Sequence, residues 1–504
     1  MTGPLMALRG AAKASRERLS GLAGQSERTI LLGTVLLVSA FSATTAYVLS
    51  QWFAVDVPAS LLSVPEDCWL DWGIGFGRHC FSDYALTVDT GLRANPWTYP
   101  IFLPWDSTQP FLIGYPAGGM LPGVIFGVPA QWLGAPQLGL VLYLMALTLA
   151  VLLPAIWAAK GTRGLERVVV FVALGAAAVP IWAVIDRGNT AGFLVPAALL
   201  FLIALRRQRW GLVAIAVILA ALVKPMFAIL VVALLAARQW RMAGLAVVGV
   251  GISNIAAYLL WPRDFPSTIV QTIRNLSIDP SFESLISLRN LSFGRALLVV
   301  PDMMKFAQTG GELPDDYLAG ARSLIGYAVA LLIMVALFVL GRRIPPVLVG
   351  IVLLATATLL PPVVFSYYLV FALPVAAVIV RDPEGPRASG IFDYLSVKGD
   401  RRRFVGICTS LAVALSIAQM ALPGQASEAQ IFGQLGAQGL IGTTLVVGTT
   451  VFLTPFLWIA TCVSIIVSYA RRPDDSDEVR PMSAEGQPDT EGNTTAGQSE
   501  LVRD

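Results

Sequence analysis

Charged residues are scarce in this sequence, and their scarcity points to a class of protein. Asp, Glu, Lys and Arg together make up 13% of the chain, about half the share that soluble globular proteins carry. Apolar residues make up 56% and form runs that recur from residue 29 to residue 470. Because about 20 apolar residues span a bilayer as a helix, we expect an all-α protein that crosses a membrane many times.

Motifs of soluble nucleotide-dependent enzymes are also missing. The chain has no GxxxxGK loop and no glycine fingerprint of a strand-helix unit. It has a single histidine, His79, without the partners of a metal centre or a serine triad. The net charge of +3 gives no indication of nucleic acid as a partner. We expect no metal site and no certain cofactor. Without a nucleotide-binding motif, energy or an activated substrate would have to come from a gradient or from the membrane itself.

Cysteine is rare as well, with four in the whole chain. Cys408 and Cys462 fall within apolar runs and are expected to be small core residues. Cys68 and Cys80 share one polar loop, where an oxidising compartment would permit a disulfide. Neither their spacing nor their neighbours indicate zinc.

The positions of Lys and Arg predict the topology, because basic residues in short loops mark the cytoplasmic side. The segment 1–28 is basic, and later basic clusters lie near residues 160–167, 206–209, 238–241, 342–343, 381–403 and 471–472. If all of them are cytoplasmic, both termini are inside and the chain crosses about twelve times. The expected spans are 29–50, 137–158, 167–185, 189–205, 211–223, 225–237, 242–261, 321–340, 345–363, 365–380, 404–421 and 440–470.

This parity requires that residues 118–133 do not cross, and their prolines and glycines favour a re-entrant or interfacial segment. The predicted organisation is a cytoplasmic segment 1–28, a membrane domain 29–470 and a disordered tail 473–504, which is polar and almost without apolar residues. Two outer loops, 51–115 and 262–320, interrupt the domain. The second has apolar residues at helical spacing, as in helices that lie on a membrane surface.

Three charged residues are predicted to lie on the same, outer side of the membrane. Asp83 lies in the first outer loop, Arg187 begins an Arg-Gly-Asn turn between two spans, and Lys224 precedes a proline between two short spans. A guanidinium or an ammonium at such a place suits a phosphate group. The alternatives are a helix N-cap for Asp83, a solvated turn for Arg187 and a lysine that snorkels to lipid headgroups for Lys224.

These motifs, in their order along the chain, resemble glycosyltransferase family 87. The resemblance is carried by Asp83-Tyr84 with Gly91, Tyr99-Pro100, Tyr115-Pro116, Arg187-Gly188-Asn189, Lys224-Pro225 and the basic residues 238–241, with a weaker likeness over 365–380. Members of that family are C-type (GT-C) membrane enzymes that use polyprenyl-phosphate sugars, among them mannosyl- and arabinofuranosyltransferases of bacterial envelopes.

The resemblance implies roles for particular residues. Asp83 would be the catalytic base, with Asp71, Asp67 and Glu66 as alternatives, since other C-type transferases carry acidic pairs after the first span. Arg187, Lys224 and Asn189 would bind the donor phosphate. The substrate-binding candidates are Tyr84, Tyr99, Tyr115, Tyr367 and Tyr368.

The expected function is therefore transfer of a sugar, mannose or arabinofuranose, from a polyprenyl-phosphate donor to a lipid-linked or cell-wall glycan. The reaction would take place at the outer face of a bacterial plasma membrane, with membrane lipids as the other partners. The alternative is a secondary transporter or flippase of a lipid-linked precursor, which would also carry charged residues at broken helices. Such carriers usually show internal repeats, and the sequence has no convincing one.

Overall fold

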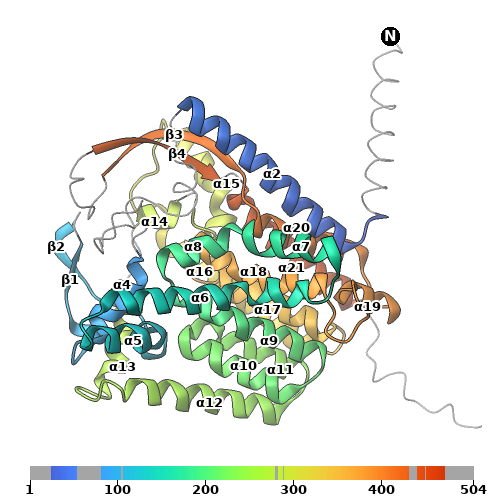
Figure 1. Ribbon diagram of the computed structural model, residues 1–504, viewed down its shortest axis with the longest axis horizontal. Helices are drawn as coiled ribbons and strands as arrows, with labels where there is room; N and C mark the ends of the chain where they lie inside the picture. Colours follow the sequence, from blue (N-terminus) through green and yellow to red (C-terminus); the bar gives the residue numbers. More distant parts are fainter. Residues whose placement is uncertain are drawn as a thin grey trace, which may run out of the picture.

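The fold is helical, as the apolar runs predict. The computed structural model describes residues 24–53, 81–103, 106–277, 282–287, 289–430, 440–448 and 450–471 (Figure 1). Two small antiparallel hairpins accompany the helices. They are formed by β1 (Ile101–Leu103) with β2 (Asp106–Phe111), and by β3 (Ala421–Gln430) with β4 (Leu440–Gly448).

The first half of the described chain is helical, apart from the strands β1 and β2. Its helices are α2 (Glu27–Phe53), α4 (Ser82–Gly91), η2 (Pro96–Thr98), α5 (Ala117–Trp132), α6 (Pro136–Ala159), α7 (Gly164–Phe171), η3 (Val172–Ala176), α8 (Val179–Arg187), η4 (Thr190–Leu194), α9 (Val195–Arg206), α10 (Trp210–Val223), η5 (Pro225–Val231), α11 (Val232–Ala236) and α12 (Trp240–Tyr258).

The second half of the described chain is helical as well, apart from the strands β3 and β4. Its helices are α13 (Ser267–Leu276), α14 (Phe282–Ile286), α15 (Phe293–Gln308), α16 (Ala319–Leu340), α17 (Pro346–Leu359), η6 (Ser366–Phe371), α18 (Ala372–Val380), α19 (Ile391–Val397), α20 (Arg403–Ile417), η7 (Val451–Leu453) and α21 (Thr454–Ala470). All nine residues of α18 are buried. A helix that is apolar on every side belongs in a core, and α18 lies at its centre.

Five described helices are long and apolar enough to cross a membrane, namely α2, α6, α12, α16 and the helix formed by η7 and α21. A sixth candidate is the pair formed by α7–η3 and α8, which bends by 44°. Six further apolar helices are only 10–17 residues long. Membrane-capable helices are thus established, whereas the count of about twelve crossings stays a prediction.

The outer surfaces of these helices are apolar, as lipid contact requires. Leu37 on α2, Leu245 on α12 and Leu332 on α16 are all more than half exposed. The interior is filled by small and branched side chains from α6, α9, α17 and α18. The bundle therefore has an apolar outer surface around an apolar core, and polar groups gather at its two ends.

One expected span is wrong in part. The sequence predicts a single helix over residues 440–470, but the helical part begins only at Val451, because residues 440–448 form β4 and pair with β3. The segment is rich in Thr and Val, which favour strands over helices. Residues 118–133, expected to be a re-entrant or interfacial segment, form the single helix α5 despite Pro122 and Pro129.

The basic loops meet at one end of the bundle, near α19 (Figure 1). Arg206 Nη2 lies 2.9 Å from Asp382 Oδ2, and Arg401 Nη2 lies 2.7 Å from Glu27 Oε2. Arg343 donates to the Ala470 carbonyl at the same end. Loops predicted to share one side of the membrane therefore contact one another. The helices α4 and α5 lie at the opposite end of α6 (Figure 1).

Candidate active site

The first residue of this site along the chain is Asp83, which lies in the first turn of α4. Its side chain is buried, with 7% of the residue exposed. Arg187 Nε donates to Asp83 Oδ2 at 3.0 Å, and Arg187 Nη2 lies 3.4 Å from Oδ1. Asn189 Nδ2 donates to Asp83 Oδ2 at 2.7 Å. Residues more than a hundred positions apart thus form one charged cluster, whose carboxylate is held by a guanidinium and an amide.

The turn between α8 and η4 places Arg187 and Asn189. Gly188 ends α8 with φ 63°, a left-handed conformation that glycine adopts without strain. The Asn189 side chain then caps η4, because its Oδ1 accepts from the Ala191 N–H at 2.8 Å. An amide both accepts and donates, so Nδ2 remains available to Asp83 and to the Tyr115 hydroxyl, 3.2 Å away. Tyr143 fixes the turn by donating to the Gly188 carbonyl at 2.7 Å.

Lys224 reaches the same cluster from the break between α10 and η5. It is buried, and its Nζ lies 4.3 Å from the centre of the Tyr115 ring and 5.8 Å from that of Tyr368. Pro225 begins η5, so the backbone leaves the helical path at Lys224. The broken helix expected from the sequence is present, and it turns the ammonium group toward aromatic faces.

Aromatic rings from η6 complete one wall. The Arg187 Cζ lies 5.3 Å from the centre of the Tyr367 ring and 5.6 Å from that of Phe365. The ring centres of Tyr367 and Tyr368 lie 4.7 Å apart, and the two rings are tilted by 32°. These rings shield the guanidinium from bulk water, and such shielding strengthens its attraction for an anion.

The charges around Asp83 oppose the effect of its burial. Burial by itself raises the pKa of the Asp83 carboxyl, but the Arg187 charge and hydrogen bond, the Asn189 hydrogen bond and the Lys224 charge together hold that pKa below its ordinary value. The pKa of Tyr115 is raised well above its usual value, first by burial and then by the Asp83 charge. Asp83 is therefore ionised and Tyr115 neutral near pH 7.

Two of the tyrosines selected from the sequence lie elsewhere. Tyr84 points into the core, where its ring lies 4.5 Å from that of Tyr143, and burial raises its pKa to about 12. Tyr99 accepts a hydrogen bond from Arg93 Nη2 at 3.0 Å. Tyr115, Tyr367 and Tyr368, by contrast, line the cluster. The other residues considered in the sequence lie outside the described residues, namely Glu66, Asp67, Asp71, Cys68, Cys80 and His79.

Two contributors escaped the sequence analysis. Tyr143 lies in the middle of an apolar helix and reads as a core residue, although its hydroxyl supports the turn at Gly188. Phe365 directly precedes the Ser-Tyr-Tyr motif, and that neighbourhood was the only available signal. Within the described part of the chain, no group of three or more His, Cys, Asp or Glu side chains could hold a metal ion.

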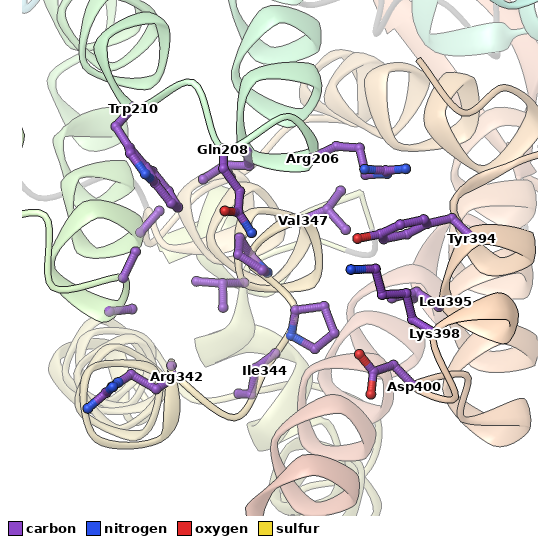
Figure 2. Close-up of a pocket in the computed structure, with 18 residues that line it drawn as sticks. Arg206, Gln208, Trp210, Arg342, Ile344, Val347, Tyr394, Leu395, Lys398 and Asp400 are labelled. Atoms are coloured by element: carbon purple, nitrogen blue, oxygen red, sulfur yellow. The ribbon is translucent and has the colours of Figure 1, made fainter. Parts of the chain in front are cut away.

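A cavity of about 360 Å³ lies at the other end of the bundle. Figure 2 shows Tyr394 and Lys398 projecting toward it, with Arg206, Arg342 and Asp400 also on its wall. The helix formed by η4 and α9 begins beside Asn189 and ends at Arg206, so its length separates this cavity from Asp83. The cavity belongs to the basic end, and we place the candidate active site at the charged cluster, where a carboxylate meets two cations.

The fold and this cluster define a membrane protein that holds a buried carboxylate beside an arginine and a lysine at one end of its apolar helices. The sequence model of glycosyltransferase family 87 matches residues 115–360, just under half of the chain. Over this region the chain is similar to glycosyltransferase family 87, and this likeness supports a membrane glycosyltransferase. No curated protein and no solved structure matches the chain. The matched region includes Tyr115, Arg187, Asn189 and Lys224, and begins after Asp83.

Proposed function

We propose that this protein transfers a sugar, mannose or arabinofuranose, from a polyprenyl phosphate to a lipid-linked or cell-wall glycan. The reaction would take place at the outer face of the plasma membrane. The observation that carries the proposal is the contact of Asp83 with Arg187 and Asn189, next to Lys224. Such a transfer needs a base for the acceptor hydroxyl and cations for the departing phosphate. The cluster contains both kinds of group, and apolar helices surround it.

In the proposed reaction, Asp83 takes the proton of the acceptor hydroxyl. The acceptor oxygen forms a bond to the anomeric carbon while the bond from that carbon to the phosphate oxygen breaks. The electron pair leaves with the polyprenyl phosphate, whose growing negative charge is stabilised by Arg187 and Lys224. Tyr115, Tyr367 and Tyr368 offer ring faces against which a sugar can lie.

The ion pair between Asp83 and Arg187 suggests how donor binding activates the base. A carboxylate with a lowered pKa is a weak base, and here the Arg187 charge is the largest of the effects that lower it. A donor phosphate that draws Arg187 and Lys224 toward itself weakens that effect, while burial continues to raise the pKa. Asp83 then becomes a stronger base only when the donor is present.

The test follows transfer of radiolabelled sugar by the purified protein in lipid, from a panel of polyprenyl-phosphate sugars to membrane glycolipid extracts. We expect the wild type to transfer from at least one donor, and Asp83→Asn to lose at least about 100-fold in rate, since a general base contributes about 10²- to 10⁴-fold. The donor that works identifies the sugar.

The matched control is Asp89→Asn on the same helix. Asp89 is exposed and pairs with Arg93 at 3.3 Å on the surface of the same helix, so its loss should leave transfer within about twofold of wild type. Transfer that survives in Asp83→Asn would move the base to Asp71, Asp67 or Glu66. A folded wild type that transfers from no donor would contradict the proposal and favour a carrier of lipid-linked precursors.

A further inference from the structure

A second cluster of buried charges lies between α15 and α16. Arg322 on α16 is 1% exposed and binds Asp302 on α15 through both nitrogens, with Nη1 to Oδ2 at 2.8 Å and Nη2 to Oδ1 at 2.6 Å. Arg322 Nη2 also donates to the Tyr317 carbonyl at 3.2 Å. In this two-pronged pair the carboxylate balances the charge of the Arg322 guanidinium.

Arg295 adds a further positive charge without a further carboxylate. It lies in the first turn of α15 and is 4% exposed. Its Nε and Nη1 are buried and have no hydrogen-bond partner within the described structure, and the same holds for Arg322 Nε. Burial lowers the pKa of Arg295, the Asp302 charge opposes that effect, and the Arg322 charge adds to it. The cluster thus holds two guanidinium groups for one carboxylate.

A buried charge without a partner is among the costliest arrangements in a folded protein, so it calls for a counter-ion. The start of α15 suits an anion for a second reason, since the N-terminus of a helix carries a partial positive charge. Ser292 caps that terminus and accepts from the Arg295 N–H at 3.2 Å. Both the side chain and the helix end therefore favour a negatively charged group here.

The surface beside Arg295 indicates what carries that group. The outward side of α15 exposes Leu297, Val300, Met303 and Met304, and Leu324 of α16 is 68% exposed. A small soluble anion would gain no binding energy from contact with such an apolar surface. A phosphate borne on hydrocarbon chains uses both features, with its headgroup at the arginines and its chains along α15 and α16.

This cluster also shares a wall with the candidate active site. The Leu291 N–H donates to the Val364 carbonyl at 2.9 Å, and Asn290 Nδ2 donates to the Pro362 carbonyl at the same distance. Phe365, the residue after Val364, faces Arg187. The chain segment 362–365 thus lies between the start of α15 and the Asp83 cluster.

We propose that Arg295, supported by Arg322, binds the phosphate of a membrane lipid whose chains lie against α15 and α16. This is a lipid site separate from the phosphate-binding role proposed for Arg187 and Lys224. The further view that this lipid is one of the two substrates, held while the other substrate occupies the Asp83 cluster, rests on the proposed function. Binding itself does not depend on it.

The test measures thermal unfolding of the full-length protein in a non-ionic detergent as lipid is added. The probes are dioleoyl phosphatidylglycerol, a polyprenyl monophosphate and, as the neutral control, dioleoyl glycerol. We expect the wild type to unfold at rising temperature with either phosphate lipid but not with dioleoyl glycerol. The phosphate lipid that binds more tightly identifies the source of the headgroup.

Arg295→Gln should weaken the apparent affinity for that lipid by about 10- to 100-fold, as loss of a charge-assisted hydrogen bond predicts. Without lipid it should unfold no earlier than wild type, because the variant removes a buried charge that has no carboxylate of its own within the described structure. The matched control is Arg274→Gln on α13, an exposed arginine in the same loop, which should bind as wild type.

Two results would overturn the proposal. One is an equal loss of lipid binding in Arg295→Gln and Arg274→Gln, which would indicate a general surface charge effect. The other is a variant Arg295→Gln that unfolds early without lipid and still responds fully to lipid, as a purely structural arginine would. Asp83→Asn should keep its response to dioleoyl phosphatidylglycerol unchanged, so the result for this lipid stands even if Asp83 is not the catalytic base.

Discussion

Asp83 has two properties that a catalytic base does not usually combine. It is buried, and burial alone would make it a stronger base, yet the arginine and lysine around it keep its pKa low. The pairing stabilises the folded protein above the ordinary pKa of an aspartate, and that stabilisation is lost as the pH falls through the lowered pKa. If Asp83 is the base, as proposed, the free enzyme is stable but holds a weak base, and donor binding is expected to change the balance.

This balance predicts a pH dependence. The rate constant kcat/KM reports on the free enzyme, so its acidic limb should fall at a pH below the ordinary aspartate range. The limb of kcat reports on the bound complex, where a phosphate competes for Arg187, and should lie at higher pH. Transfer rates measured from pH 3 to 8 at low and at saturating donor check the order of the two limbs.

Arg187→Gln serves as the control for that measurement. The variant lacks the charge that lowers the pKa of Asp83 most strongly, so its kcat/KM limb should move up toward the kcat limb of the wild type. Two limbs that coincide in the wild type would contradict activation by donor binding, and would leave Asp83 with one pKa in both states.

Among the structural elements, the turn between α8 and η4 positions Arg187 and Asn189 in the candidate active site. Gly188→Ala is expected to disturb it in two ways. A side chain at φ 63° costs about 1 to 2 kcal/mol in backbone strain, and the added Cβ would lie 2.9 Å from the Cβ of Tyr84. We expect a lower unfolding temperature and at least about a tenfold loss of transfer, because Arg187 and Asn189 flank the displaced residue.

Gly164→Ala separates these two effects. Gly164 has φ 56°, but an added Cβ there would meet nothing within 4 Å. This variant bears the same kind of backbone strain far from Asp83, so it should lose stability while keeping transfer. Equal activity in the two variants would show that the turn does not position the site.

The elements also show what the sequence could and could not predict. Apolar runs predicted the helices, and basic loops predicted which turns share an end, because both follow from local composition. The placement of Asp83, Arg187 and Lys224 on one side of the membrane followed from the same reasoning, but their contact did not. Three further features were not predicted, namely the strand β4, the support from Tyr143 and the cluster at Arg295. Each depends on a partner that is distant in sequence, and the local pattern does not indicate which partner a residue finds.

At the scale of the whole molecule, the ends of the bundle differ in chemistry. One end joins basic loops through pairs such as Arg206 with Asp382 and Arg401 with Glu27. The other carries the Asp83 cluster and the helices α13 and α15. A chain that sorts its loops in this way should sit in the membrane with the basic end in the cytoplasm. The orientation is still a prediction, because the fold alone does not distinguish inside from outside.

Cysteine labelling tests that orientation. Gln308 at the end of α15 and Ser396 in α19 are both exposed, and they lie in loops expected on opposite sides. In a background with Cys68 and Cys80 replaced by serine, a membrane-impermeant maleimide added to intact cells should label Gln308→Cys and spare Ser396→Cys until the cells are opened. The reverse pattern would put the Asp83 cluster in the cytoplasm. The donor lipid would then have to present its sugar there, and the proposed reaction at the outer face would be excluded.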